Sequence, residues 1–190
     1  MDKRTLALLA ALGATTIYGL NHTIAKEVMP TYIQGFGFVQ VRLLGAAILF
    51  WLVSLFIPQQ KISRSDLPKM LLCALLGMVV NMLCFFKGIE LSTPINSAVL
   101  ITITPILVFV FSALLIKERL ILPRILGVVL GFIGAFVLIV FGNEIRQDAP
   151  NIPLGNALFI VNASSFGMYL VLVKSLSAKY TTVHLLKWLF

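Results

Sequence analysis

A single arginine interrupts one of the long apolar runs of the chain. Arg42 lies six residues after the start of the run Phe36–Ile57, which is about 9 Å along a helix. Inside a bilayer, a guanidinium at that depth is costly unless it is paired or hydrated. Binding of a substrate carboxylate or phosphate would stabilise it there, and so would bracing a gate through backbone carbonyls. The structural alternative is a side chain that reaches back along its helix to the membrane interface.

Three polar side chains gather in the preceding apolar run, Leu6–Ala25. Tyr18, Asn21 and His22 are spaced by three and four residues, so on a helix they lie on neighbouring faces. We expect them to form a polar rim that contacts substrate. Imidazole titrates near neutral pH, which makes His22 the candidate for a proton-coupling site. A histidine that only hydrogen-bonds a neighbouring helix at the membrane interface is an interpretation at least as good.

Other uncharged polar side chains lie in later apolar runs. Such groups could line a cavity between helices and change partners between two conformations of the protein. Interhelical hydrogen bonding is the structural alternative for each of them. The predicted substrate-binding set joins Arg42, Tyr18, Asn21 and His22 with Asn81, Asn96, Asn162 and Tyr169, and further wall candidates are Thr102, Thr104, Ser164 and Ser165.

Two residues of the run Pro94–Ile116 and its flank are hinge or gate candidates. Pro105 removes a backbone hydrogen bond in mid-run and crowds the carbonyl of Ile101, so a kink is expected. Glu118 follows the run between Lys117 and Arg119. From the residues alone, we favour pairing of Glu118 with basic loop residues, or capping of a neighbouring helix, over contact with substrate.

Motifs of enzymes are absent from the sequence. It has no His-Glu-x-x-His, no Gly-x-Ser-x-Gly, no paired aspartates within an apolar run and no Gly-rich phosphate loop. The chain is therefore predicted not to be an enzyme and to bind no metal or other cofactor. Because it also lacks a nucleotide-binding motif, we expect proton or sodium coupling, or facilitated exchange, to drive transport.

Composition requires most of the protein surface to face lipid. Of the residues, 59% are hydrophobic and 12% are charged, about half the charged fraction of soluble domains, and the mean hydropathy is +1.02. The net charge of +8 comes from Lys and Arg spread through loops, which argues against nucleic acid as a partner. We expect an all-α, polytopic helix bundle whose six complete spans are Leu6–Ala25, Phe36–Ile57, Met70–Phe86, Pro94–Ile116, Ile125–Phe141 and Leu154–Val173, with a partial seventh span from Thr182 to Phe190.

Basic residues fall unequally on the two sides that these spans define. Short cytoplasmic loops carry the excess of Lys and Arg, so the N-terminus is predicted to be cytoplasmic and the protein to lie in the plasma (inner) membrane. The N-terminal side has ten basic residues, Lys3, Arg4, Lys61, Arg64, Lys69, Lys117, Arg119, Arg124, Lys174 and Lys179, whereas the other side has Lys26, Lys87 and Arg146.

A weak internal repeat relates the sixth span to the first. A shift of 148 residues aligns Thr16, Tyr18, Gly19 and Lys26 with Ser164, Phe166, Gly167 and Lys174. Five spans separate the two starts, so the first would run outward and the sixth inward. This arrangement is the inverted repeat of many secondary transporters.

The chain resembles the EamA-like branch of the drug/metabolite transporter superfamily over nearly its whole length. The matching features, in order, are QVRLLGA at 40–46, KGIELSTPINSA at 87–98, TPILVFVFSALLIKERL at 104–120, and Gly127, Gly131 and Gly134 in the fifth span. The resemblance implies ten helices in two inverted five-helix repeats with a substrate cavity between them. It also raises the expectation that Glu118 takes part in a cytoplasmic gate.

On this resemblance, residues 5–142 would form the first repeat, 143–153 a loop, and 154–190 the start of the second repeat. The sequence stops inside the seventh predicted helix, and we expect either a fragment or a truncated gene product. The predicted function is alternating-access transport of a small polar metabolite, with an amino-acid-like molecule as one option and export favoured by the family. A truncated, non-transporting membrane interaction protein is the alternative, and a homodimer is left open.

Overall fold

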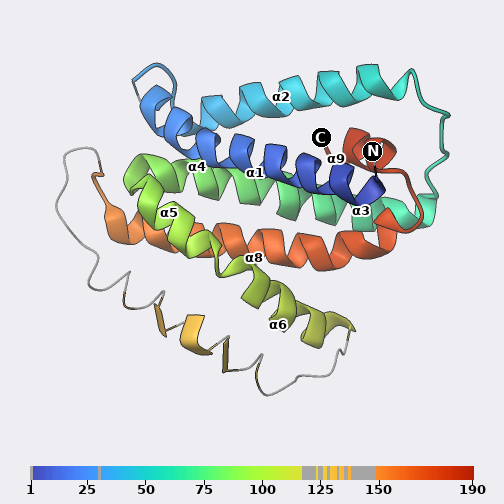
Figure 1. Cartoon of the computed structure of the whole chain (residues 1–190). Helices are drawn as coiled ribbons and strands as arrows, with labels where there is room; N and C mark the ends of the chain where they lie inside the picture. The colour runs from blue at the N-terminus through green and yellow to red at the C-terminus, as the bar shows by residue number, and fades with distance from the viewer. Residues whose placement is uncertain are drawn as a thin grey trace.

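The computed structural model of the chain describes residues 2–29, 31–116 and 149–190, with a few positions between 123 and 137 (Figure 1). In these residues the regular structure is helical, and the predicted all-α class is confirmed for them. Helices follow from the apolar runs because a segment surrounded by lipid must satisfy its backbone hydrogen bonds internally.

The first two helices form an antiparallel hairpin. α1 (Lys3–Val28) runs in one direction and α2 (Gly35–Ser54) runs back in the opposite direction (Figure 1). Many large apolar side chains of this hairpin face away from the protein, such as Ile17 and Val41. Exposure on this scale is unusual for a soluble protein and fits a lipid-facing surface.

The third helix is one continuous rod that contains a π-helical turn. A short 3₁₀ turn, η1 (Arg64–Asp66), leads into α3 (Leu67–Ala74), then the π-helix η2 (Leu75–Val80) and α4 (Asn81–Leu91). The rod extends the predicted span Met70–Phe86 at both ends. The sequence did not predict this extension, because polar residues at both ends interrupt the apolar run but not the helix.

Two charged side chains join the first hairpin to the end of α4. The Glu90 carboxylate accepts a hydrogen bond from the backbone N–H of Gly35, at the start of α2. Nζ of Lys26 donates to the backbone carbonyls of Ile89 and Ser92, each 2.9 Å away. A carboxylate at a helix N-terminus and an ammonium at a helix C-terminus both complement the helix dipole. The two contacts therefore stabilise helix ends and fix the hairpin on the third helix.

The fourth helix is interrupted in its middle. α5 (Pro94–Ile101) begins at the N-cap Thr93, whose side chain accepts a hydrogen bond from the N–H of Asn96 at 3.1 Å. Two turn residues, 102 and 103, separate it from α6 (Thr104–Ile116). The interruption lies directly before Pro105, which has no N–H to continue the helical hydrogen bonding.

α8 is the central helix of the described structure. It spans Ile152–Ser177, and the side chain of Asn151 accepts from the N–H of Leu154 at its start. In an apolar stretch of 18 residues within α8, half of the residues are buried inside the protein, compared with 6% in the corresponding stretch of α2. α4, α5 and α6 pack along it, and the short helix α9 (Thr182–Leu189) follows and packs against α2 and α3 (Figure 1).

Glycines bring α4 and α8 into backbone contact near one end. A Cβ atom at Gly155 would lie 2.5 Å from Cβ of Ser92 and 2.9 Å from the carbonyl oxygen of Gly88. A Cβ atom at Gly88 would lie 2.7 Å from the ring of Phe159. Only glycine fits at these two positions without a shift of the helices.

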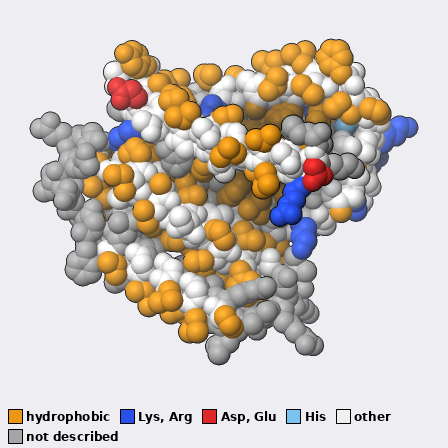
Figure 2. Space-filling model, viewed as in Figure 1, with side chains coloured by type: hydrophobic (Ala, Val, Ile, Leu, Met, Phe, Trp, Pro, Cys, Tyr) orange, Lys and Arg blue, Asp and Glu red, His pale blue; other side chains and the backbone are white. Residues whose placement is uncertain are grey.

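Four of the described helical segments are long and apolar enough to cross a membrane. They are α2, the rod of α3, η2 and α4, the pair α5 and α6, and α8, and they match four of the six predicted spans. α1 covers the predicted span Leu6–Ala25 as one 26-residue helix but is not among the four. Most of the predicted span Ile125–Phe141 lies outside the described residues. Figure 2 shows apolar side chains distributed across the whole viewed face, with few charged side chains among them. The chain is therefore a multi-pass membrane protein.

The helices define two ends of the bundle (Figure 1). We call the end with the α1–α2 and α4–α5 connections and the start of α8 the α1–α2 end. The opposite end, with the α2–α3 and α8–α9 connections, is the α2–α3 end. α1 starts at the α2–α3 end and α8 at the α1–α2 end, so the two helices run in opposite directions, as the predicted inverted repeat requires. The repeat itself stays a prediction.

Candidate functional site

A cavity of about 1060 Å³ lies among the helices. Its volume suffices for a small metabolite. Residues of α1, α2, η2, α4, α5, α6, α8 and α9 contribute to the wall. The wall residues are Tyr18, Phe50, Gly77, Met78, Asn81, Met82, Ile101, Thr102, Thr104, Pro105, Val108, Asn162, Phe166, Tyr169, Leu170, Leu186 and Phe190.

Two helices are irregular where they form this wall. Gly77 and Met78 belong to the π-helix η2, and Thr102, Thr104 and Pro105 surround the break between α5 and α6. π-helical turns occur frequently at functional sites. Transporters also build binding sites from discontinuous helices, because irregular backbone at membrane depth is tolerated only in protein or beside a cavity. The backbone itself thus marks this cavity as the candidate site.

Side chains of α8 hold the π-helix and its flank in place. Nδ2 of Asn162 donates to the carbonyl of Asn81 at 2.8 Å, and Nδ2 of Asn81 makes a longer contact, 3.5 Å, with the carbonyl of Asn162. The hydroxyl of Ser165 donates to the carbonyl of Leu76 at 2.6 Å. A π-turn leaves carbonyls poorly paired, so these contacts stabilise it from the neighbouring helix.

Tyr169 packs directly on the π-helix. A Cβ atom at Gly77 would lie 2.6 Å from the Tyr169 ring, so the glycine provides the space that the ring occupies. Phe166 stacks on the same tyrosine, with ring centroids 5.6 Å apart and planes inclined by 30°. The wall of α8 is therefore aromatic where it meets the π-helix.

Five of the ten predicted site residues lie on the cavity wall. They come from four helices and include the hinge candidate: Tyr18, Asn81, Asn162, Tyr169 and Pro105. Their contact with a substrate stays a prediction.

Arg42 and Asn21 lie off the wall and pair with each other. Nη1 of Arg42 donates to Oδ1 of Asn21 at 2.5 Å, which joins α2 to α1. The guanidinium carbon is 5.2 Å from the ring centroid of Phe86 and 5.8 Å from that of Phe38. Two aromatic faces and one amide oxygen thus partner this cation, which reduces the cost of its position in the bilayer.

Asn96 belongs to a buried polar cluster at the α1–α2 end. Its Nδ2 lies 3.3 Å from the hydroxyl of Ser92 and 3.2 Å from Oδ1 of Asn156, and the Ser92 hydroxyl donates to the same Oδ1 at 2.8 Å. The cluster ties the α4–α5 junction to α8. The two remaining candidates, the His22 side chain and Glu118, lie outside the described residues.

A second polar cluster, which we did not predict, lies at the α2–α3 end. His184 of α9 is 1% exposed, and its Nδ1 lies 3.1 Å from the Thr181 hydroxyl. Its Nε2 lies 3.3 Å from both the N–H of Gln60 and Oε1 of Gln59. Nothing in the sequence links residue 60 to residue 184, so only the fold could reveal this cluster.

An ion pair reinforces the same end. Nζ of Lys179 lies 3.1 Å from each carboxylate oxygen of Asp66, and the Tyr180 hydroxyl donates to Asp66 at 2.8 Å. These contacts connect η1 to the turn between α8 and α9. Together with the histidine cluster, they hold the last described segment against η1 and the loop between α2 and α3.

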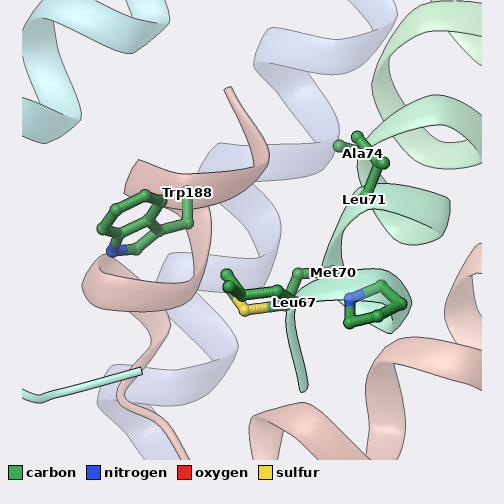
Figure 3. Close-up of a pocket in the computed structure, with 6 residues that line it drawn as sticks. Leu67, Met70, Leu71, Ala74 and Trp188 are labelled. Carbon is green, nitrogen blue, oxygen red and sulfur yellow. The ribbon is translucent and has the colours of Figure 1, made fainter. Parts of the chain in front are cut away.

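A smaller hollow of about 460 Å³ lies beside α9 (Figure 3). Figure 3 shows the Trp188 indole on α9 and, across from it, the side chains of Leu67, Met70, Leu71 and Ala74. This lining provides no ionisable group or amide that could orient a polar substrate. We therefore assign the candidate site to the larger cavity.

Some wall residues were not among the predicted site residues. Phe50, Phe166 and Phe190 are aromatic residues in apolar runs, where packing or lipid contact is the ordinary interpretation. Gly77 is one of many glycines. The spacing of Asn162, Phe166 and Tyr169, at four and three residues, places them on one face of α8 and could have indicated an aromatic neighbour of the amide.

Several curated proteins that are similar in sequence to this chain are named as transporters. Uncharacterized transporter YetK of Bacillus subtilis is 23% identical over 90% of this chain and 50% of its own length. An uncharacterized transporter of Archaeoglobus fulgidus is 27% identical over 90% of this chain and 58% of its own length. An uncharacterized transporter of Methanothermobacter thermautotrophicus is 31% identical over 64% of this chain and 35% of its own length.

The chain spans about half the length of the curated relatives it matches. No solved structure matches it significantly. The family model of the EamA-like transporters matches residues 5–140, which is more than half of the chain. The chain therefore belongs to the EamA-like transporter family.

Proposed function

We propose that the protein is a secondary transporter that moves a small molecule across the plasma membrane by alternating access. The observation that carries the proposal is the cavity between two irregular helices, the rod with its π-turn and the interrupted pair α5 and α6. Family membership supports a transporter. The substrate, the direction, the driving ion and the orientation of the N-terminus belong to the proposal.

Roles follow from the positions of the side chains. Tyr18, Asn81, Asn162 and Tyr169 contact the substrate, because they are polar groups on the wall. The break before Pro105 serves as the hinge, since a helix that lacks hydrogen bonds there bends at small cost. The Arg42–Asn21 pair braces α1 against α2.

Alternating access requires that each end of the cavity can close. The amide and hydroxyl cluster of Ser92, Asn96 and Asn156 would close the α1–α2 end. The contacts of His184 and Asp66 would close the α2–α3 end. Each cluster joins α8 or the α8–α9 segment to earlier helices, so a relative movement of these parts would break one cluster while the other persists.

Export and proton coupling complete the proposal. Export rests on the family resemblance. Proton or sodium coupling is favoured over ATP hydrolysis because the sequence lacks a nucleotide-binding motif, and His22 is the proton candidate.

The test is flux through the chain in proteoliposomes. Vesicles that contain the protein are loaded with a mixture of small amines, amino acids and amides, and efflux is followed by mass spectrometry with and without a proton gradient. We expect release of a subset of these solutes, faster than from empty vesicles and dependent on the gradient.

A matched pair of variants shows whether flux uses the cavity. Gly77→Ala places a methyl group 2.6 Å from the Tyr169 ring, whereas Gly45→Ala on α2 places it in open space. We expect flux to fall at least about tenfold for Gly77→Ala, as displacement of a positioned ring by 1 Å can do, and to stay unchanged for Gly45→Ala. Absence of solute-specific flux from correctly inserted protein would contradict the proposal and favour a non-transporting membrane interaction protein.

A further inference from the structure

We propose that the cavity selects a molecule with an aromatic body and a hydrogen-bond-donating polar end, such as an amine, and that it disfavours anions. This inference names the substrate class of the proposed transport cavity and therefore rests on the proposed function. It narrows the small polar metabolite expected from the sequence.

The polar side chains of the wall offer acceptors more than donors. The Nδ2 groups of Asn81 and Asn162 contact backbone carbonyls, and only an amide N–H can donate there, which fixes the orientation of both side chains. Among the described residues, no hydrogen bond uses either Oδ1. The Thr102 hydroxyl donates to a backbone carbonyl at 2.6 Å and keeps its lone pairs. Pro105 has no N–H for the carbonyl of Ile101.

Two further hydroxyl groups on the wall can either donate a hydrogen bond to a ligand or accept one from it. Thr104 and Tyr169 line the cavity, and a hydroxyl can donate or accept. They add to the acceptors when the ligand carries N–H groups. A ligand whose polar end donates several hydrogen bonds therefore finds more partners here than a ligand whose polar end only accepts.

Aromatic rings surround the same space from several helices. Tyr18 comes from α1, Phe50 from α2, Phe166 and Tyr169 from α8, and Phe190 follows α9. Flat apolar groups stack on such rings, and ring faces also attract cations. An ammonium group that leaves water can thus replace its hydration with carbonyl and hydroxyl oxygens and with ring faces.

Within the described part of the chain, an anion finds hydroxyl donors on the wall but no cationic side chain. No Lys, Arg or His belongs to the wall within the described part of the chain. Arg42 is partnered by Asn21 and by the rings of Phe38 and Phe86, off the wall. A carboxylate in the cavity would lose its hydration without gaining a charged partner, which is unfavourable in a low-dielectric site.

Two matched probes test the inference on the unmodified chain. 2-Phenylethylamine and 3-phenylpropionate share a phenyl ring and a two-carbon linker and differ in the charge at the end. Their binding is measured by isothermal titration calorimetry to the 190-residue chain in phosphatidylcholine nanodiscs, with empty nanodiscs subtracted. We expect the amine to bind at least about tenfold more tightly than the carboxylate. Equal or tighter binding of the carboxylate, or no binding of the amine, would overturn the inference.

A pair of variants places the binding in the cavity. Phe166→Leu removes a wall ring, and Phe56→Leu makes the same change at a residue that is 88% exposed and off the wall. We expect amine affinity to fall about fivefold to tenfold only for Phe166→Leu, the worth of one aromatic contact with a cation. Equal affinities in both variants would also overturn the inference.

The outcome separates the two proposals. Amine binding without flux keeps the inference and contradicts transport by this chain. Flux of anions alone keeps transport and contradicts the inference.

Discussion

The two ends of the helix bundle carry polar contacts of different kinds. At the α1–α2 end, Ser92, Asn96 and Asn156 form a neutral cluster whose members are 7% exposed or less. At the α2–α3 end, an ion pair joins Asp66, whose side chain is 12% exposed, to Lys179, whose side chain is 57% exposed. Water reaches the exposed ammonium of Lys179 and can replace its partner, whereas a fully buried amide that loses its partner is costly. We infer that the α2–α3 end opens more readily.

Backbone contacts strengthen the same contrast. α4 and α8 touch at Gly88 and Gly155 near the α1–α2 end, which leaves no room for movement without separation of the helices. The α2–α3 end instead relies on side chains of a short helix, α9. Lys187 of α9 lies with its Nζ 4.2 Å from the Trp51 ring centroid, an adaptable contact. The two ends thus differ in rigidity as well as in charge.

The largest expected effect concerns which end faces the cytoplasm. In a background without Cys73 and Cys84, Ser65→Cys marks the α2–α3 end and Tyr32→Cys, at a position 83% exposed, marks the α1–α2 end. We expect an impermeant maleimide to label Tyr32→Cys in intact cells and Ser65→Cys only after permeabilisation, because the α2–α3 end carries the predicted cytoplasmic loops. The reverse pattern would overturn the proposed orientation.

The next largest effect tests the backbone contact. Gly155→Ala forces a methyl group against Ser92 and the carbonyl of Gly88, so we expect the free energy of unfolding to fall by about 3 kcal/mol. Gly45→Ala, where nothing lies within 4 Å, is the control. Unfolding in detergent by increasing sodium dodecyl sulfate measures both. Similar stabilities of the two variants would mean that the helices move apart easily at this end.

Removal of the central amide should have a smaller effect. Asn156→Ala leaves the Ser92 hydroxyl and Nδ2 of Asn96 without their shared acceptor, and we expect a loss of about 1 kcal/mol. A double-mutant cycle with Ser92→Ala isolates the hydrogen bond between the two residues. Zero coupling in that cycle would remove the argument that this cluster closes its end of the bundle.

The smallest effect is expected for the ion pair. Asp66→Asn keeps the size of the side chain and its hydrogen bond from Tyr180 but removes its charge, and salt screens a pair whose ammonium is exposed. We expect a shift of the unfolding temperature that is barely measurable at low salt and absent at high salt. A loss as large as that of Asn156→Ala, unaffected by salt, would show that both ends are equally rigid.

Hydropathy made much of this fold predictable. Four predicted spans coincide with described helical segments because lipid leaves the backbone no alternative to the helix. Pro105 indicated the irregular part of the fourth helix for a local reason, its missing N–H. Asn81, Asn162 and Tyr169 were noticeable as polar groups in apolar runs, and the fold brings all three to one cavity.

The direction in which each side chain points was harder to predict. The depth of Arg42 says nothing about the rotation of α2, and in the structure its guanidinium meets Asn21 instead of the wall. The π-turn at Leu75–Val80 has no proline or polar signature, because the contacts that stabilise it come from residues of α8 more than 80 positions away. Both features depend on packing between distant segments.

The π-turn also bears on how this helix tolerates length changes. A π-helix bonds each N–H to the carbonyl five residues earlier, so its single turn holds about one residue more than an α-helical turn. Deletion of one residue within Leu75–Val80 could therefore be absorbed as an ordinary α-helix, without rotating α3 relative to α4. The same deletion elsewhere in the rod would turn one half by about 100° against the other. Sequence alignments of this family should accordingly place single-residue gaps at this turn.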